Sequence, residues 1–136
     1  METNHERYIV RKPVYEHAAG IKNRQSPAMT YMSNKQVPEV NHYLEYRWIC
    51  GFPEPNPHIL EHVHENDEII LHFGGDPENP EDLGGTIELS VRGEPLLFDT
   101  TSAIFAPKGL HHCPVVWKEF RKPHMEMAIT MGSGRR

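Results

Sequence analysis

Hydrophobic and polar residues alternate in several short segments of this chain, and no helix-period pattern runs longer than about two turns. A period of two is typical of β-strands, because successive side chains point to opposite faces of a sheet. We therefore predict about eight short strands, at residues 43–50, 59–64, 68–73, 86–91, 95–98, 102–106, 112–118 and 124–131. Short strands separated by turn signals favour an all-β fold, built as a sandwich or a small barrel.

Prolines and glycines separate the predicted strands. The chain contains 12 prolines and 10 glycines, and this content disfavours long helices. Three prolines predict a loop over residues 51–57, and a longer loop is expected at 74–85. Residues 1–40 are interpreted as an irregular N-terminal arm, with a possible short strand at 7–10. Such an arm packs on its own domain or on a partner subunit, or stays mobile.

The last predicted strand has two chemically different faces. Met125, Met127, Ile129 and Met131 alternate on one face, with His124, Glu126 and Thr130 on the other. We interpret the methionine-rich face as core packing, because methionine fills irregular apolar space.

Composition limits the class of protein. The 136 residues amount to 15.7 kDa, which is enough for one hydrophobic core. With 14 basic and 19 acidic residues the net charge is −5, so no basic surface for nucleic acid is expected. The mean hydropathy of −0.61, a polar N-terminus and two cysteines argue against a membrane span, a secretory signal and a disulfide scaffold. We therefore expect a cytoplasmic protein.

Acidic residues are concentrated in the middle of the chain. No Lys or Arg lies between Arg47 and Arg92, whereas that stretch contains ten acidic residues. It is either a solvated acidic surface or a negative field that favours a bound cation. Its acidic loop, residues 76–82, could also form a lid.

The histidines provide the strongest chemical signal. His62 and His64 are two residues apart, so on a strand both imidazoles would project from one face. Glu68 follows after a predicted turn, and the pair His111–His112 lies several strands later. Imidazole and carboxylate ligands together suit Fe, Mn, Ni, Cu or Zn.

In these segments the sequence resembles the cupin superfamily. The first cupin motif, which combines His-x-His with Glu and Gly, is matched by His62, His64, Glu68 and Gly75. The second motif, Pro-x-Gly-x-x-His, is matched by Pro107, Gly109 and His112. The chain departs from the flanking positions of these motifs at Asn56, Thr101 and Val116.

The resemblance implies an antiparallel jelly-roll β-barrel over residues 41–131, with the arm before it and a tail at 132–136. It also implies a homodimer and one divalent metal ion in the barrel mouth. The ligands implied by the motif are His62, His64, Glu68 and His112. His111 is the alternative to His112, although strand alternation would point it away.

Two kinds of function are compatible with such a site. One is a metalloenzyme with isomerase, lyase or dioxygenase chemistry on a small polar, oxygen-bearing molecule. The other is a non-catalytic cupin that binds or senses a small molecule or a metal.

The strand before the first motif supplies the candidate substrate-binding residues Tyr46, Arg47 and Trp48. Either Tyr46 with Trp48, or Glu45 with Arg47, would face inward. An inward Arg47 could clamp an anionic substrate. Cys113 is expected to point away from His112 as a small buried hydrophobe, and His72 to be a polar wall residue.

Overall fold

The computed structural model describes residues 5–16, 20–25, 27–57 and 64–134. In these residues the regular structure consists of β-strands and one short 3₁₀ helix. The elements are η1 (His5–Tyr8), β1 (Val14–Glu16), β2 (Lys22–Arg24), β3 (Ala28–Met32), β4 (His42–Glu54), β5 (Glu68–Gly74), β6 (Asp82–Val91), β7 (Glu94–Thr100), β8 (Ser102–Ala106), β9 (His112–Phe120) and β10 (His124–Met131). Over the described ranges, no helix has the length and apolar character needed to cross a membrane.

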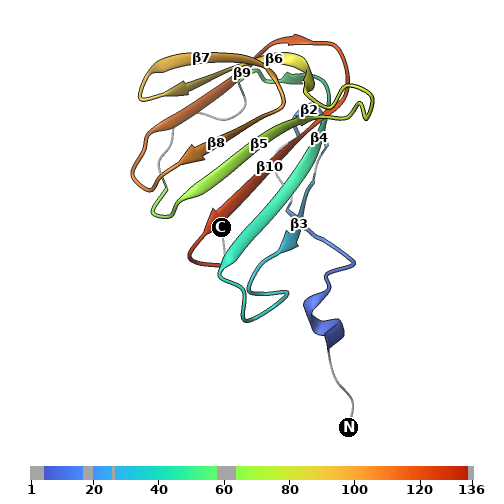
Figure 1. Ribbon diagram of the computed structural model, residues 1–136, viewed down its shortest axis with the longest axis vertical. Helices are drawn as coiled ribbons and strands as arrows, with labels where there is room; N and C mark the ends of the chain where they lie inside the picture. The colour runs from blue at the N-terminus through green and yellow to red at the C-terminus, as the bar shows by residue number, and fades with distance from the viewer. Residues whose placement is uncertain (1–4, 17–19, 26, 58–63, 135–136) are drawn as a thin grey trace.

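The strands form two antiparallel sheets that lie as two layers (Figure 1). The larger, seven-stranded sheet has the order β1-β3-β4-β10-β5-β8, and β2 also pairs with β4. The smaller sheet has the order β7-β6-β9. Their pairings are antiparallel, which confirms the all-β fold expected from the alternation and the jelly-roll type implied by the cupin resemblance.

Most predicted strands are present, with different ends in some cases. The segments 102–106 and 124–131 coincide with β8 and β10. The loop predicted from residue 51 is wrong as far as Glu54, because β4 continues to that residue and pairs there with Lys22 of β2. A register shift between the two paired ends accommodates Pro53, which has no N–H to donate.

The predicted strand at 59–64 lies outside the described residues, apart from His64, which is not in a strand.

The N-terminal region contains more regular structure than the sequence analysis predicted. β1 and β3 extend the edge of the large sheet, and β3 pairs directly with β4. The possible strand at 7–10 is not formed, because its first two residues end η1. Buried Thr30 of β3 shares a 2.7 Å hydrogen bond with the hydroxyl of Tyr43 on β4. The region from 28 to 32 is therefore a strand of the main sheet.

The apolar core lies between the sheets and contains residues of β4, β6 and β9. Its fully enclosed members are Ile49, Leu83, Ile87, Leu89, Cys113, Val115 and Trp117. The prediction that the methionine face of β10 packs in this core is wrong. His124, Glu126 and Thr130 are the buried side chains of β10, whereas Met125 and Met127 are only partly buried on the outer face. The inner face of β10 is polar because it lines a cavity.

Candidate metal centre

Three of the residues implied by the cupin motifs come together at one end of the space between the sheets. One ligand atom from each of His64, Glu68 and His112 lies within 4.8 Å of the others. Nε2 of His64 is 3.5 Å from Glu68 Oε2, and Nε2 of His112 is 3.4 Å from Glu68 Oε1. Glu68 and His112 are buried, but the side chain of His64 is 37% exposed. The cluster is therefore reachable from solvent on the His64 side.

A tight turn before β9 holds His64 close to His112. Gly109 has a φ of 81°, a left-handed conformation that favours glycine, and its N–H donates to the His64 carbonyl at 3.0 Å. The N–H of Lys108 donates to Asp67 Oδ1 at 2.9 Å. These two hydrogen bonds join the turn to the segment before β5, so the Pro-x-Gly pattern has a direct role in assembling the site.

His112 has the tautomer that a metal ligand requires. Its Nδ1–H donates to the Leu110 carbonyl at 2.9 Å, which leaves the lone pair on Nε2, directed toward Glu68. When Nε2 is protonated, the imidazolium can donate to the Glu68 carboxylate, and this interaction raises the pKa of His112. A divalent cation would benefit from the same negative charge, so its binding would compete with that proton.

The donor set fits a divalent transition metal. Ligand atoms that each lie about 2.0–2.2 Å from one ion are about 3–4 Å apart, close to the distances from Glu68 to the two imidazoles. His111 is exposed and is not a member of the cluster, whereas His112 is. His62, the remaining ligand implied by the motif, lies outside the described residues.

A cavity of about 280 Å³ extends inward from the cluster. Its walls come from the inner faces of β4, β5, β9 and β10, and its lining residues are Glu45, Arg47, His64, Glu68, Ile70, His72, Cys113, Val115, Glu126 and Ala128. Arg47, Glu126 and His72 occupy directly opposed positions on three adjacent strands. This row of charged and polar groups was not predicted from the sequence, although the polar face of β10 was a signal for it.

The row is held by buried ion pairs. Nη1 of Arg47 donates to Glu126 Oε1 at 2.5 Å, and Nη2 lies 3.2 Å from Glu45 Oε1. Burial lowers the pKa of Arg47, but the two carboxylates outweigh this effect and raise it. Burial also lowers the pKa of His72, whose Nδ1 is 3.8 Å from Glu126 Oε2, so this imidazole is neutral at pH 7.

Strand alternation divides the three candidate substrate-binding residues. Arg47 faces inward with Glu45 and lines the cavity, while Tyr46 and Trp48 project from the outer face of β4. Tyr46 stacks there on Tyr31, with ring centroids 5.6 Å apart. Arg47 is already engaged by two carboxylates, which argues against the anion clamp considered from the sequence.

Cys113 also lies on the cavity wall, because its φ of 74° interrupts the alternation of β9. Both His112 and Cys113 are consequently buried on the inner side, so the expectation of opposite directions is wrong. Burial raises the pKa of Cys113 to about 12, which keeps the thiol protonated.

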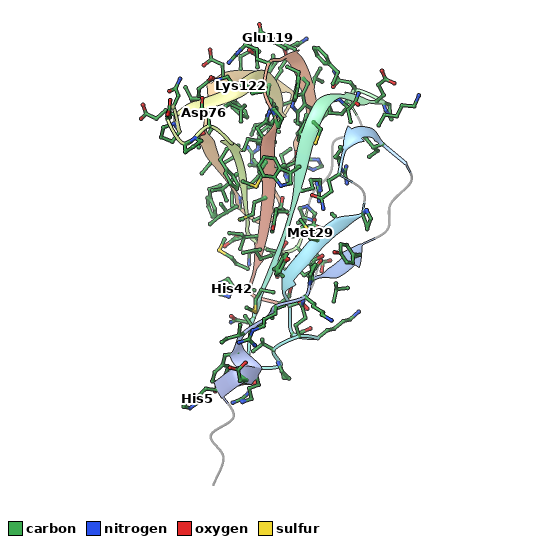
Figure 2. The ribbon with its side chains drawn as sticks, turned by 90° about the vertical axis from the view of Figure 1, so that its right-hand side faces the viewer. His5, Met29, His42, Asp76, Glu119 and Lys122 are labelled. Atoms are coloured by element: carbon green, nitrogen blue, oxygen red, sulfur yellow. The ribbon has the colours of Figure 1, made fainter. Side chains whose placement is uncertain are left out.

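The acidic loop lies at the other end of the sheet from the cluster. Asp76 pairs with Lys122 at 3.1 Å, and Asp82 pairs with Arg121 at 2.8 Å. Figure 2 shows Asp76 and Lys122 together at one end of the molecule, far from His42 at the start of β4. Glu68 belongs to the His42 end, because it pairs with Thr130 beside Tyr43. The loop is thus tied to the β9–β10 turn and does not cover the metal cluster.

Comparison with solved structures identifies the same fold in several proteins. A predicted oxalate decarboxylase from Thermotoga maritima superposes with a TM-score of 0.55 at 10% identity, covering 90% of this chain and 96% of its own. A cupin superfamily protein from Desulfitobacterium hafniense gives 0.52 at 9% identity, covering 85% and 84%. A sugar phosphate isomerase from a cupin superfamily, from Silicibacter pomeroyi, gives 0.54 at 8% identity, covering 91% and 72%. The sequence matches no protein-family model and no curated protein.

Proposed function

Because this chain has the cupin fold, we propose that it is a metalloprotein that holds one divalent ion with His64, Glu68 and His112. The main evidence is that three potential ligand atoms, from two segments far apart in the sequence, lie within 4.8 Å of one another at the open end of a cavity. His62 is the proposed fourth ligand, from the segment next to His64. Iron, manganese, nickel, copper and zinc all suit this ligand set.

The proposed activity is that of an enzyme on a small polar, oxygen-bearing molecule. When bound, the metal would act as a Lewis acid toward an oxygen atom of that molecule. The apolar wall formed by Ile70 and Val115 would exclude water around it. His72, which is neutral and lines the same cavity, would offer one hydrogen-bond donor and one acceptor to that molecule.

Metal content tests the proposal, with neighbouring histidines as matched variants. Elemental analysis of protein purified without added metal should give about one equivalent per chain, in keeping with one three- or four-ligand site. His112→Ala and His64→Ala should lose that metal. His111→Ala should keep it, because His111 is exposed and outside the cluster. Equal metal content in all three variants, or none in the parent protein after titration, would refute the site.

We also propose that the chain forms a homodimer through the outer face of the large sheet. Two rows of directly opposed apolar residues cross β4, β10, β5 and β8 on that face, and a third crosses β4, β10 and β5. They comprise Leu44, Ile129, Ile69 and Phe105, then Tyr46, Met127, Leu71 and Ala103, then Trp48, Met125 and Phe73. A contiguous apolar sheet face of this kind is typical of an interaction surface, and a symmetric partner would cover it with an identical face.

A further inference from the structure

The inner end of the cavity carries a polar row that the metal cluster does not use. Glu68 and His72 are four residues apart on β5, so their backbone positions differ by about 13 Å along the strand. Glu68 belongs to the metal cluster, whereas His72 is opposed to Glu126 and Arg47. A small molecule that enters past His64 would therefore meet two chemically different ends of one cavity.

The inner end has an excess of negative charge. Two carboxylates, Glu45 and Glu126, face one guanidinium, Arg47, and all three side chains are at least nine-tenths buried. His72 contributes no compensating positive charge, because its burial keeps it neutral. A carboxylate or phosphate group placed here would add a further negative charge to a desolvated site, which is strongly unfavourable.

The same row contains buried nitrogen atoms that lack a hydrogen-bond partner among the described residues. They are Nε of Arg47 and both ring nitrogens of His72, a side chain that is 0% exposed. The guanidinium Nε–H can only donate, and a neutral imidazole offers one donor and one acceptor. An ammonium group on a ligand only donates, so it cannot accept a hydrogen bond from Arg47 Nε–H or from the imidazole N–H of His72. A hydroxyl group both donates and accepts.

We infer that the inner end of the cavity is a hydroxyl-binding subsite, and that the ligand is a neutral polyhydroxylated molecule. This inference deepens the proposed function, on which it rests for the outer, metal-binding end of the cavity. Hydroxyl groups would accept from Arg47 Nε–H and from the imidazole N–H of His72, and they would donate toward the carboxylates. A cavity of about 280 Å³ has room for one molecule of this kind.

Calorimetric titration with matched five-carbon ligands tests this inference. The probes are xylitol, ribitol and arabinitol, each beside the corresponding carboxylate and terminal amine, which differ only in the charge of one end. We expect at least one pentitol to bind tenfold or more tightly than its carboxylate and amine counterparts. A carboxylate or amine that binds as tightly as its pentitol, or no pentitol binding at all, would overturn the proposal.

Variants that neutralise one carboxylate test whether this row causes the discrimination between a pentitol and its carboxylate. Glu126→Gln and Glu45→Gln each bring the net charge of the row to zero, so each should reduce the discrimination against the carboxylate at least tenfold. Glu94→Gln, at an exposed position on β7, should leave that discrimination unchanged. Unchanged discrimination in both folded cavity variants would contradict the assignment to this row.

The two proposals can fail separately. The titrations are made on the zinc-loaded protein and on protein stripped of metal, while metal content is measured independently. Pentitol selectivity in a protein that never takes up metal would support the subsite and refute the metal centre. A stoichiometric metal without such selectivity would refute the subsite and leave the metal centre in place.

Discussion

The indole N–H of Trp117 donates to Nε2 of His124 at 3.0 Å, and this hydrogen bond joins the two sheets. Trp117 belongs to β9 of the small sheet, and His124 to β10 of the large sheet. The other nitrogen of His124, Nδ1–H, donates to the Lys122 carbonyl at 2.9 Å. Both ring nitrogens are thus occupied in the neutral form, and a second proton would break the contact with Trp117.

Stability should therefore fall when the solution is acidified. Burial lowers the pKa values of His124 and His72 below the ordinary value near 6.5. Above about pH 6.5 these two histidines are neutral in both the folded and the unfolded chain. Their protonation therefore costs no free energy of unfolding in that range. Below it the unfolded chain takes up protons that the folded chain excludes, at a cost of about 1.4 kcal/mol per pH unit for each histidine. Urea unfolding between pH 8 and 5 measures this slope.

Replacing His124 separates its contribution to that slope. His124→Gln keeps an amide that can both accept and donate but cannot be protonated in this range. The variant should be less stable at pH 8 and should lose less stability on acidification. A pH dependence identical to that of the parent would show that His124 does not titrate as argued.

Arg47 and Arg121 form a matched pair, because each contacts two carboxylates. Arg47 contacts buried Glu45 and Glu126, while Arg121 contacts Asp82 and Glu119 at the surface. Arg47→Met should lower the free energy of unfolding by about 3–5 kcal/mol, because two buried carboxylates lose their counter-charge. Arg121→Met should cost less than about 1 kcal/mol. Denaturant melts of both variants measure the difference, and equal losses would contradict the buried-charge argument.

Sequence alternation predicted much of the fold because each central strand has one buried and one less buried face. It failed where burial and polarity disagree. On β10 the methionines were predicted inside, yet Glu126 and His124 are the enclosed residues. A sheet whose inner face lines a polar cavity and whose outer face is apolar reverses the ordinary pattern, and the sequence of one strand cannot reveal this.

The candidate site was predictable to the extent that motif spacing is local. His64 and Glu68 are close in sequence, and the Pro-x-Gly turn fixes His112 relative to them through backbone hydrogen bonds. The Arg47–Glu126 pair joins residues 79 positions apart, so its existence depends on strand order. Only the pairing of β4 with β10 brings these side chains together.

Two left-handed glycines test the role of the turn at the metal site. Gly109 and Gly93 have φ values of 81° and 79°, and an added Cβ would meet no atom within 4 Å at either position. Either glycine-to-alanine substitution should therefore cost about 1–2 kcal/mol of backbone strain. Gly109→Ala should in addition weaken metal binding by roughly tenfold, because it shifts the turn that supports His64 and His112.

Gly93→Ala is the control for Gly109→Ala. Gly93 lies in the β6–β7 turn, where the Arg92 N–H donates to the His111 carbonyl at 2.9 Å, whereas the Gly109 N–H donates directly to the carbonyl of the proposed ligand His64. Gly93→Ala should therefore be destabilised with a smaller loss of zinc affinity than Gly109→Ala. Competition with a chromophoric chelator measures the affinity of each protein. Equal affinity in the Gly109 and Gly93 variants would mean that the turn conformation does not position the ligands.

Self-association should depend on the outer face of the large sheet. Phe105 is 58% exposed on β8 and is opposed to Ile69 of β5 within the apolar rows. Phe105→Glu would place a charge in the proposed contact, where it would be desolvated without a partner. Sedimentation equilibrium should show a dimer for the parent chain and a monomer for this variant at the same concentration.

Leu97→Glu is the control for the effect of Phe105→Glu on dimerisation. It is 64% exposed on β7, and it belongs to the small sheet outside the proposed interface. Leu97→Glu also replaces an exposed apolar side chain with a charged one, yet it should leave the dimer intact. A monomeric parent would exclude the homodimer. A dimer disrupted by Leu97→Glu but not by Phe105→Glu would place the interface on the small sheet.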